Sequence, residues 1–498
     1  MTCGLSGRWW GDDSYVPSGV KMKKRHVDVA IIGAGTAGLN ARRECEKAGV
    51  DWVLIESGPY GTTCARVGCM PSKLLIAAAE NAHHVAQSEV FGIDVDGVRV
   101  DGRAVMDRVR RERDRFVGFV VESTLEIPEK RRLRGHARFV GPTTLQVDDH
   151  TLVEAKSIII ATGSRPWIPP QLQDVADEVM TSDQIFDLED LPSSMAVAGT
   201  GIIGLEIGQA MDRLGVDVEF FNPYDELGIF SDPEVSTKAH QSFGRQLTLH
   251  LKTEIVEARK VDEGIHIRWI DINGDEREKS FETVLAAAGR RPNFEGLDLE
   301  KAAIPLDDAG RPITDIRTLQ AGDAPIFVAG DAAGHRPLLH EASDEGSIAG
   351  ANATLYPAVE ARLRKTKVTI AFTDPQMAVV GTSFADLDAD RTEIGSVSYD
   401  NQGRARVMAV NQGLVRLYAD VTNCQLIGAE MFGPRVEHTA HLLAWAIDND
   451  EKIPQLVNRP FYHPVVEEGL RTALRRLAKQ LRITGHCSPE SFAERAGS

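Results

Sequence analysis

The chain has 498 residues, of which 42% are hydrophobic and 26% charged, and its formal net charge is −17. This length accommodates about three domains of ordinary globular composition. The acidic excess argues against a nucleic-acid partner, since phosphate binding needs clustered Lys and Arg. No apolar run approaches the ~18 residues of a membrane helix, and the cysteines are too sparse for a secreted disulfide framework. We therefore expect a cytoplasmic protein that binds neither nucleic acid nor membrane.

The first 24 residues are expected to form a poorly ordered N-terminal extension. They contain no apolar core typical of a signal peptide, and Asp12 and Asp13 are unlike a transit peptide. Met22 is the expected true start, because patterned structure begins directly after it.

The first patterned unit is a strand, a glycine turn, a helix and a second strand that ends at an acid. Residues 27–32 form an apolar run typical of a buried parallel strand, and residues 52–55 form the second strand, which ends at Glu56. The glycines between them have the dinucleotide-binding spacing: Gly33, Gly35 and Gly38. The helix N-terminus then receives a pyrophosphate, and Glu56 can accept ribose hydroxyls. This unit predicts a dinucleotide site.

Residues 61–73, GTTCARVGCMPSK, place Cys64 and Cys69 close together between glycines. Five residues of regular helix rise about 7.5 Å, whereas a disulfide needs Cα atoms closer than ~7 Å. An ideal helix would therefore not bridge them, but Gly68 relaxes the backbone and Pro71 favours a helix start or a distorted turn. These residues leave open a redox pair, packed core thiols or part of a metal site, the last disfavoured because no other Cys or His lies nearby.

The strand–turn–helix–strand unit recurs at residues 195–222. Its turn is GTGIIG, with the glycines Gly199, Gly201 and Gly204. The position where an acid would select NAD is Asn222, and no Arg follows to meet the 2′-phosphate of NADP. Because Asp225 and Glu226 close by would repel a phosphate, the pattern favours NAD without excluding NADP.

Three further apolar strands run into glycine turns, at residues 157–170, 284–293 and 325–334, and are expected to be crossing points between domains. Asp331 follows the last of them, where α/β sheets place ligand contacts, although it could instead cap a helix. From Lys367 onward, period-2 strands and a helix at Thr439–Asp448 predict a separate α+β domain for association.

Taken together, these motifs resemble the class I pyridine nucleotide-disulfide oxidoreductases, and most closely the dihydrolipoamide dehydrogenases. The resemblance covers nearly all of residues 26–480. It is carried by the ordered set GAGTAG with Glu56, CARVGCMPSK, ATGSRP, GTGIIG with Leu205-Glu206, VAGD and FYHPVVEEG.

The resemblance implies an α/β protein with two Rossmann-like dinucleotide-binding domains and a C-terminal α+β dimerisation domain. The expected bounds are 25–170 with 295–360 for the FAD-binding domain, 171–294 for the NAD(P)-binding domain, 361–482 for dimerisation and 483–498 for a tail. It also implies a homodimer with shared active sites, a small dithiol, a small disulfide or a lipoyl domain as substrate, and a possible 2-oxo acid dehydrogenase complex as partner.

The family's functional residues map onto this chain one by one. Cys64 matches the interchange thiol that meets substrate, and Cys69 matches the thiol next to the flavin. Lys73 and Glu206 match an ion pair beside the flavin ring. His463 matches the catalytic base and Glu468 its orienting carboxylate, with Glu467 as the alternative. The implied cofactor-binding residues are Gly33, Gly35, Gly38, Glu56, Thr63, Lys73, Thr162, Gly163, Gly199, Gly201, Gly204, Asn222, Gly289 and Asp331, and no metal site is implied.

The chain also departs from the family pattern. Ala65, Arg66, Val67 and Gly68 replace the usual Leu-Asn-Val-Gly between the cysteines. The predicted function is FAD- and NAD-dependent oxidation of dihydrolipoamide. The alternatives are an NADPH-dependent reductase of another small disulfide or of mercuric ion, and a non-catalytic flavoprotein subunit of a multienzyme complex. Mercury chemistry in the family uses a C-terminal cysteine pair, whereas Cys487 stands alone in the tail and is expected to be an incidental exposed thiol.

Overall fold

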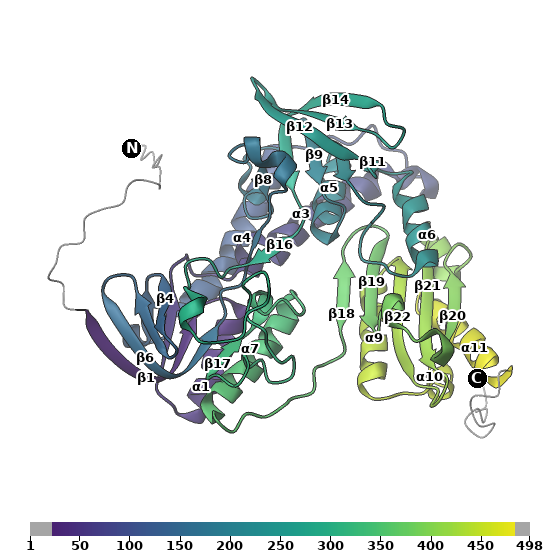
Figure 1. Ribbon diagram of the computed structural model, residues 1–498. Helices are drawn as coiled ribbons and strands as arrows, with labels where there is room; N and C mark the ends of the chain where they lie inside the picture. Colours follow the sequence, from purple (N-terminus) through teal and green to yellow (C-terminus); the bar gives the residue numbers. More distant parts are fainter. Residues whose placement is uncertain (1–21, 484–498) are drawn as a thin grey trace.

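The computed structural model describes residues 22–483 (Figure 1). Its first domain is built on a sheet of order β3-β2-β1-β6-β5-β4, in which β17 also pairs with β6. The central strand β1 (Lys23–Ile32) runs parallel to β2 (Trp52–Glu56) and to β6 (Thr151–Ile160). The other strands are β3 (Arg132–Arg134), β4 (Ala137–Gly141), β5 (Thr144–Val147) and β17 (Ile326–Val328). The inner strands are nearly all buried, as their apolar runs predict.

Strand β1 begins at Lys23, four residues before the apolar run that starts at Val27. The polar residues Lys23 to His26 extend it because they pair in register with Thr151 to Glu154 of β6. The extension predicted for residues 1–24 therefore overlaps the strand at its last two residues, and residues 1–21 lie outside the described part of the chain.

Helices α1 (Thr36–Ala48) and α7 (Leu339–Leu355) pack closely against each other beside this sheet. A Cβ added at Gly346 would lie 2.2 Å from the Ala37 carbonyl oxygen, and one at Gly350 would lie 2.6 Å from that of Ala41. Two glycines on α7 thus permit the close approach that brings the residues after β17 beside the first glycine turn.

The second domain carries the second glycine turn. Its parallel sheet has the order β11-β10-β9-β15-β8, flanked by an antiparallel sheet of order β12-β13-β14. The strands are β8 (Met180–Thr181), β9 (Ser194–Ala198), β10 (Asp217–Asn222), β11 (Thr248–Leu251), β12 (Glu254–Val261), β13 (Gly264–Ile270), β14 (Glu276–Phe281) and β15 (Thr283–Ala286), with helices α5 (Ile202–Arg213) and α6 (Pro233–Phe243). A short antiparallel ribbon of β7 (Ser164–Pro166) and β16 (Arg290–Pro292) joins the two α/β domains.

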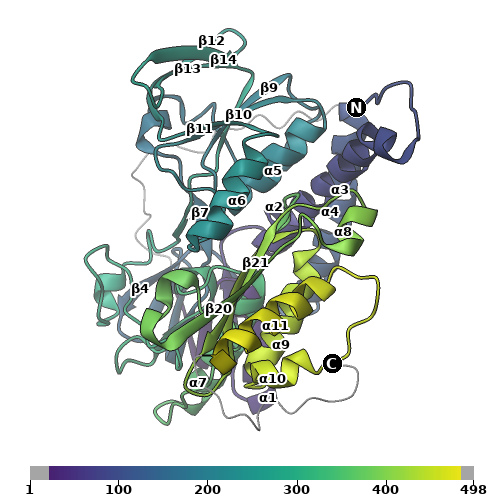
Figure 2. The ribbon, with the colours of Figure 1, turned by 90° about the vertical axis from the view of Figure 1, so that its right-hand side faces the viewer.

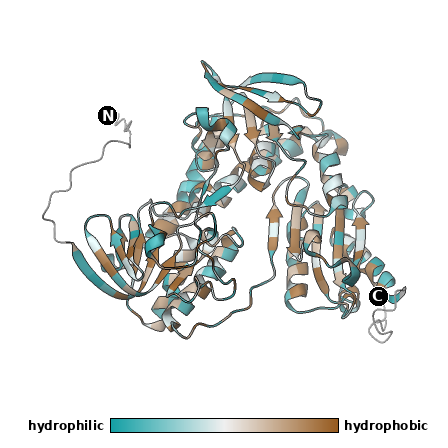
Figure 3. Ribbon diagram, viewed as in Figure 1, coloured by the Kyte–Doolittle hydropathy of each residue, from teal (hydrophilic) through white to brown (hydrophobic). Residues whose placement is uncertain are grey.

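The third domain is an antiparallel sheet of order β18-β19-β22-β21-β20, with helices α9, α10 and α11 on one side (Figure 2). Its strands are β18 (Val368–Ala371), β19 (Gln376–Gly381), β20 (Thr392–Ser398), β21 (Leu414–Asp420) and β22 (Leu426–Gly433). The helices are α8 (Gly403–Val407), α9 (Val436–Asp448), α10 (Ile453–Val457) and α11 (Glu468–Ile483). Hydrophobic residues concentrate along the strands of this sheet (Figure 3). The α+β domain predicted from Lys367 onward is present, and its helix α9 starts three residues earlier than expected.

A buried polar cluster attaches the second domain to the third. Asp232, fully buried at the start of α6, contacts Arg416 Nε at 2.7 Å and accepts a hydrogen bond from the Tyr418 hydroxyl at 2.9 Å. In return, the buried carboxylate of Glu430 accepts the backbone N–H groups of Ser231 at 3.0 Å and Asp232 at 2.9 Å. Each buried charge is therefore hydrogen-bonded or paired across the domain boundary.

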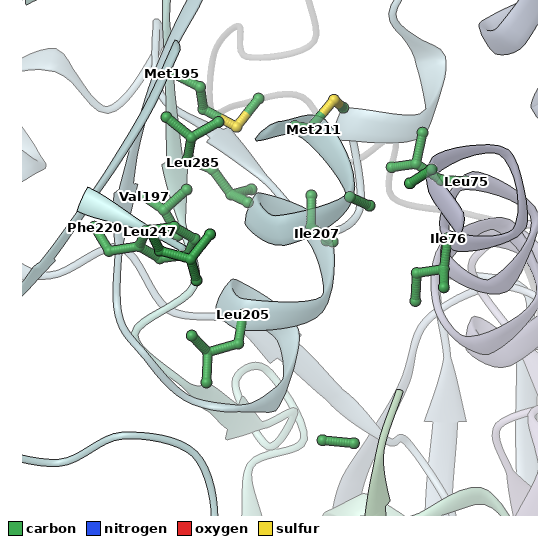
Figure 4. Close-up of a cluster of buried hydrophobic side chains, with 14 of the residues drawn as sticks. Leu75, Ile76, Met195, Val197, Leu205, Ile207, Met211, Phe220, Leu247 and Leu285 are labelled. Atoms are coloured by element: carbon green, nitrogen blue, oxygen red, sulfur yellow. The ribbon is translucent and has the colours of Figure 1, made fainter. Parts of the chain in front are cut away.

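A hydrophobic core joins helix α3 (Cys69–Ala86) of the first domain to α5 of the second. Leu75 and Ile76 of α3 face the side of α5 that carries Ile207, and the other side of α5 packs on the sheet at Val197 and Phe220 (Figure 4). This packing holds the two helices side by side, with Lys73 on one and Glu206 on the other. None of the helices between residues 22 and 483 is both long and apolar enough to cross a membrane.

Candidate active site

Both glycine turns have the shape that a dinucleotide pyrophosphate requires. Gly33 and Gly199 adopt φ of +108° and +118°, and an added Cβ would lie within 2.5 Å of a backbone carbonyl oxygen at either position. Gly38 and Gly204 are equally tight, with an added Cβ 1.9 and 2.2 Å from the carbonyl oxygens of the first glycines. These four positions therefore accept only glycine.

The middle glycine of each turn faces open space. A Cβ added at Gly35 or Gly201 would meet nothing within 4 Å, and both glycines line one continuous cavity of about 1510 Å³. This volume exceeds that of an ordinary small-molecule pocket of about 300–1,000 Å³. The first residues of α1 and α5 also line the cavity. A helix N-terminus favours the negative charge of a pyrophosphate, so the residues fit two dinucleotides.

The acid and the amide at the strand ends differ in what they already bind. Glu56 accepts N–H groups from Ala34 and Gly58, each at 2.7 Å, and lies at the end of β2 beside the first turn. Asn222 lines the cavity, but its amide donates to Thr200 Oγ1 at 2.5 Å and to a backbone carbonyl at 3.0 Å. Its side chain therefore links the second glycine turn to the loop after β10 by hydrogen bonds, a structural role that the sequence did not reveal.

The remaining predicted cofactor contacts lie around the same cavity. Its lining includes Thr63, Gly163, Gly289 and Asp331. The Thr162 hydroxyl is buried with no hydrogen-bond partner in the described chain. Asp331 does not cap helix α7, because that helix begins at Leu339 and the Asp331 Oδ2 atom accepts from the Ser164 hydroxyl at 2.6 Å.

Cys64 and Cys69 lie on two successive helices rather than on one. Helix α2 (Thr63–Val67) carries Cys64 and stops at Gly68, whose φ and ψ of −123° and −114° break the helix before Cys69 begins α3. A Cβ at Gly68 would lie 3.3 Å from Cys64 Cα, so the chain doubles back closely here. Both cysteines are free thiols that line the cavity.

The two thiols differ in acidity. The Cys64 thiol donates a hydrogen bond to Cys69, which lowers the pKa of Cys69 to about 7 against the opposing effect of desolvation, with a further contribution from the charge of Lys73. The same hydrogen bond and burial raise the pKa of Cys64 well above its ordinary value. Cys69 also occupies the N-terminus of α3, where a helix favours negative charge. Cys69 is therefore the thiolate of the reduced pair, and Cys64 keeps its proton.

Lys73 and Glu206 form an ion pair across the α3–α5 contact. The Lys73 Nζ atom lies 2.7 Å from Glu206 Oε2 and 4.6 Å from the centre of the Phe372 ring. Glu206 is only 4% exposed, and its other oxygen accepts the Phe372 N–H at 2.8 Å. Phe372 thus completes this pair from the third domain, although no sequence motif marked it.

His463 and Glu468 meet at the C-terminal end of the described chain. The His463 Nδ1 atom lies 3.0 Å from both oxygens of Glu468, so Glu468 rather than Glu467 is its partner. Burial raises the pKa of Glu468, but hydrogen bonds from His463 and the Val465 N–H outweigh it and lower that pKa. The His463 ring is 80% exposed and is not among the residues that line the cavity with Cys64. One chain therefore holds both halves of the predicted catalytic set but does not bring them together.

No group of three or more His, Cys, Asp or Glu side chains within residues 22–483 is placed to hold a metal ion. Cys487 lies outside that range.

The chain matches known families over most of its length. The model described as pyridine nucleotide-disulphide oxidoreductase matches residues 27–346, and the model for its dimerisation domain matches residues 368–474. The dihydrolipoyl dehydrogenase of Halobacterium salinarum is 30% identical over 462 residues, which cover 90% of this chain and 95% of the relative. That of Thermus scotoductus is 29% identical and covers 91% and 98%.

Solved structures agree on the fold. LpdA from Mycobacterium tuberculosis superposes with a TM-score of 0.78 at 22% identity, covering 92% of this chain and all of that one. The flavoprotein disulfide reductase RclA from Escherichia coli gives 0.77 at 20% identity, covering 91% and 99%. The predicted architecture, with two Rossmann-like domains and a C-terminal dimerisation domain, is confirmed.

Proposed function

The chain belongs to the pyridine nucleotide-disulphide oxidoreductase family, and on that premise we propose that it is a dihydrolipoyl dehydrogenase, oxidising dihydrolipoamide at Cys64 and Cys69 with NAD⁺ as acceptor. The family membership establishes a flavoprotein disulfide oxidoreductase that uses FAD and NAD(P). The dithiol itself is the proposal. One observation carries it: a cysteine pair with unequal acidities lines the cavity, in a chain that also holds a paired histidine and carboxylate.

The residues fit the two cofactors in separate parts of the cavity. The turn at Gly33–Gly38, together with Glu56 and Asp331, would hold FAD, and the turn at Gly199–Gly204 would hold the nicotinamide nucleotide. Bound FAD supplies the transfer of an electron pair between a dithiol and a nicotinamide ring. The protein supplies the positions and charges around it.

The proposed active site is shared between two subunits. The dimerisation domain supports a homodimer, and His463 is exposed and does not line the cavity of its own chain. We assign the partner subunit's His463 to Cys64, so that each site takes its thiols from one chain and its base from the other.

The thiol chemistry then follows from the site. The first substrate thiolate attacks the Cys64 sulfur of the oxidised pair, which forms a mixed disulfide and releases Cys69 as the thiolate that its lowered pKa favours. The second substrate thiolate attacks the first substrate sulfur, closes the cyclic disulfide and frees Cys64. The partner subunit's His463 takes the proton of the first substrate thiol at Nε2, because Nδ1 faces the carboxylate that fixes its tautomer. The proton of the second substrate thiol passes to the Cys64 sulfur as that sulfur leaves, so Cys64 ends as the protonated thiol of the pair, Cys69 as the thiolate, and the partner subunit's His463 keeps the first proton.

The nucleotide end of the cavity favours NAD over NADP. Beyond the braced Asn222, the lining continues through Tyr224, Glu226 and Glu254. Asp225, next in the chain, pairs with Lys252 at 2.6 Å. Two lining carboxylates would repel a 2′-phosphate, and the nearby lysine is already neutralised.

The test is a steady-state panel on the purified protein loaded with FAD. Dihydrolipoamide with NAD⁺ is compared with other dithiols, and NADPH with glutathione disulfide forms the opposing arm. We expect dihydrolipoamide to give a kcat/KM at least about a hundredfold above that of generic dithiols, because a dedicated site binds its transition state selectively. Equal rates with generic dithiols would refute the assignment. Binding of an isolated lipoyl domain would test the proposed link to a 2-oxo acid dehydrogenase complex.

A second candidate is the reduction of a different, anionic disulfide. Arg66 lies between the cysteines, and no carboxylate within residues 22–483 forms an ion pair with its guanidinium. The same panel decides between the two, since a preference for NADPH with an anionic disulfide would favour this candidate.

A further inference from the structure

The ribbon between the two α/β domains carries a polar chain that reaches from one cofactor region to the other. Strands β7 and β16 pair antiparallel at this crossing, with Arg291 opposite Arg165. Ser164 begins β7 in the first domain, and Arg290 begins β16 in the second. Neither residue was assigned a role from the sequence, although both lie in the Arg-Pro stretches identified as domain crossings.

Arg290 holds both domains at once. Its Nε and Nη2 atoms donate to the Ser164 hydroxyl at 2.9 Å and to the Ser164 carbonyl at 2.8 Å. Its Nη1 atom donates to Asp183 at 3.0 Å and Ser182 at 3.2 Å, within its own domain. The side chain is only 18% exposed. The planar guanidinium therefore uses both its edges, one in each domain.

The direction of the next hydrogen bond is determined by chemistry. A guanidinium can only donate, so the Ser164 hydroxyl must accept from Arg290 and has a single proton left to donate. That proton goes to Asp331 Oδ2, 2.6 Å away. A positive charge at the far end polarises the hydroxyl and strengthens this bond.

The backbone directly before Asp331 is held independently from the other side. The Gly330 N–H donates at 2.7 Å to Glu345, a fully buried carboxylate that Arg364 contacts at 2.8 Å. The backbone is thus fixed one residue before Asp331, one Asp331 oxygen accepts from Ser164, and the residue lines the cavity.

We propose that Arg290 is a positioning residue which, through the Ser164 hydroxyl, orients the Asp331 carboxylate for the flavin and ties that orientation to the placement of the nucleotide domain. This inference rests on the proposed function in one respect, because it takes the cavity beside Asp331 to hold FAD. The Ser164 hydroxyl is the only link between Arg290 and Asp331 in this chain of hydrogen bonds. Without it, Arg290 still donates to the Ser164 carbonyl but is no longer connected to Asp331.

The experiment compares four variants of the full-length protein. Ser164→Ala removes the linking hydroxyl, and Ser164→Thr keeps a hydroxyl. Arg290→Lys keeps the positive charge but cannot donate from two edges as the guanidinium does. Arg165→Ala is the matched control, since Arg165 lies on the same ribbon, pairs with Glu295 and is 44% exposed. The FAD dissociation constant is measured by flavin fluorescence, and reduction of bound flavin by NADH is followed by stopped flow.

We expect Ser164→Ala to weaken FAD binding about tenfold, the effect of losing a hydrogen bond to a charged group. Flavin reduction by NADH should slow as well, with Arg290→Lys showing the same combination. Ser164→Thr should recover to within about twofold, and Arg165→Ala should match the wild type, because an exposed ion pair contributes little.

The proposal is overturned if Ser164→Ala binds FAD as tightly as Arg165→Ala, or if Ser164→Thr is as impaired as Ser164→Ala. Failure of the proposed function looks different: a wild type that binds FAD but does not prefer dihydrolipoamide loses its substrate assignment, while the FAD affinities of the variants still decide the role of Arg290. A wild type that binds no FAD overturns both.

Discussion

The unequal acidities of the two cysteines lead to a prediction about Cys64→Ala. The main cause of the low pKa of Cys69 is the hydrogen bond from the Cys64 thiol. Alanine removes that donor, whereas Cys64→Ser replaces it with a hydroxyl in the same place. We therefore expect the Cys69 pKa to rise in the alanine variant and to stay near 7 in the serine variant.

The size of the effect follows from the structure. A fall in the Cys69 pKa from 9.0 to about 7 corresponds to about 2.7 kcal/mol in favour of the thiolate. Because Cys69 is exposed, solvent screens part of this stabilisation of the thiolate. We expect the Cys64→Ala variant to lose about half of this roughly 2.7 kcal/mol. The midpoint should therefore rise by about one pH unit, leaving Lys73 and the N-terminus of α3 to supply the remainder.

The assay measures alkylation of Cys69 by iodoacetamide as a function of pH, with the modified peptide quantified by mass spectrometry. In the FAD-loaded protein, the long-wavelength absorption of a thiolate beside oxidised flavin should titrate with the same midpoint. Equal midpoints in the alanine and serine variants would show that the Cys64 hydrogen bond does not set the acidity of Cys69. The absence of the absorption band from both would contradict placement of Cys69 beside the flavin.

Three other perturbations test the site and its supports. Glu468→Gln should lower dithiol turnover by at least about tenfold, because His463 loses its orienting charge, yet leave NADH reduction of ferricyanide unchanged; an equal loss in both assays would contradict this. Lys73→Met should slow flavin reduction from either side, because it leaves the buried Glu206 carboxylate without its cation. Flavin reduction as fast as in the wild type would argue against the pair's role. Asp232→Ala should destabilise the protein by about 3–5 kcal/mol, because it leaves Arg416 buried at the domain boundary without the Asp232 carboxylate. A fall in Tm no larger than that of Asp400→Ala, which breaks the surface pair of Asp400 with Lys238, would refute this.

Local sequence was sufficient to predict the elements whose geometry depends on neighbouring residues alone. A tight turn needs glycine where its backbone has a positive φ or where a carbonyl oxygen leaves no room for a Cβ. Both positions lie within the turn itself, so Gly33 and Gly38 were recognisable from their spacing. The helix break at Gly68 was similarly readable, because it lies between the two cysteines that it brings together.

The same reasoning failed where one side chain could serve either a ligand or the protein. Asn222 has the position of a ribose contact, but its amide is used by Thr200 and a backbone carbonyl of the following loop. A sequence shows that an amide is present and not which acceptor it meets. The early start of β1 at Lys23 was missed for a related reason, since polar residues join a strand only when a distant strand offers the register.

Several features were readable from the sequence because each depends on short-range backbone chemistry: the family motifs, the glycine turns, the cysteine pair and the ends of the strands that carry them. Only the folded structure shows which groups meet across domains. Phe372 contacts Lys73, Asp232 pairs with Arg416 of the third domain, and Arg290 donates to Ser164, which in turn donates to Asp331. These contacts join residues up to 299 positions apart, as Lys73 and Phe372 are. Hydrogen bonds and ion pairs act over a few ångströms of space, and no local pattern in the chain records which distant segments packing will bring within that range.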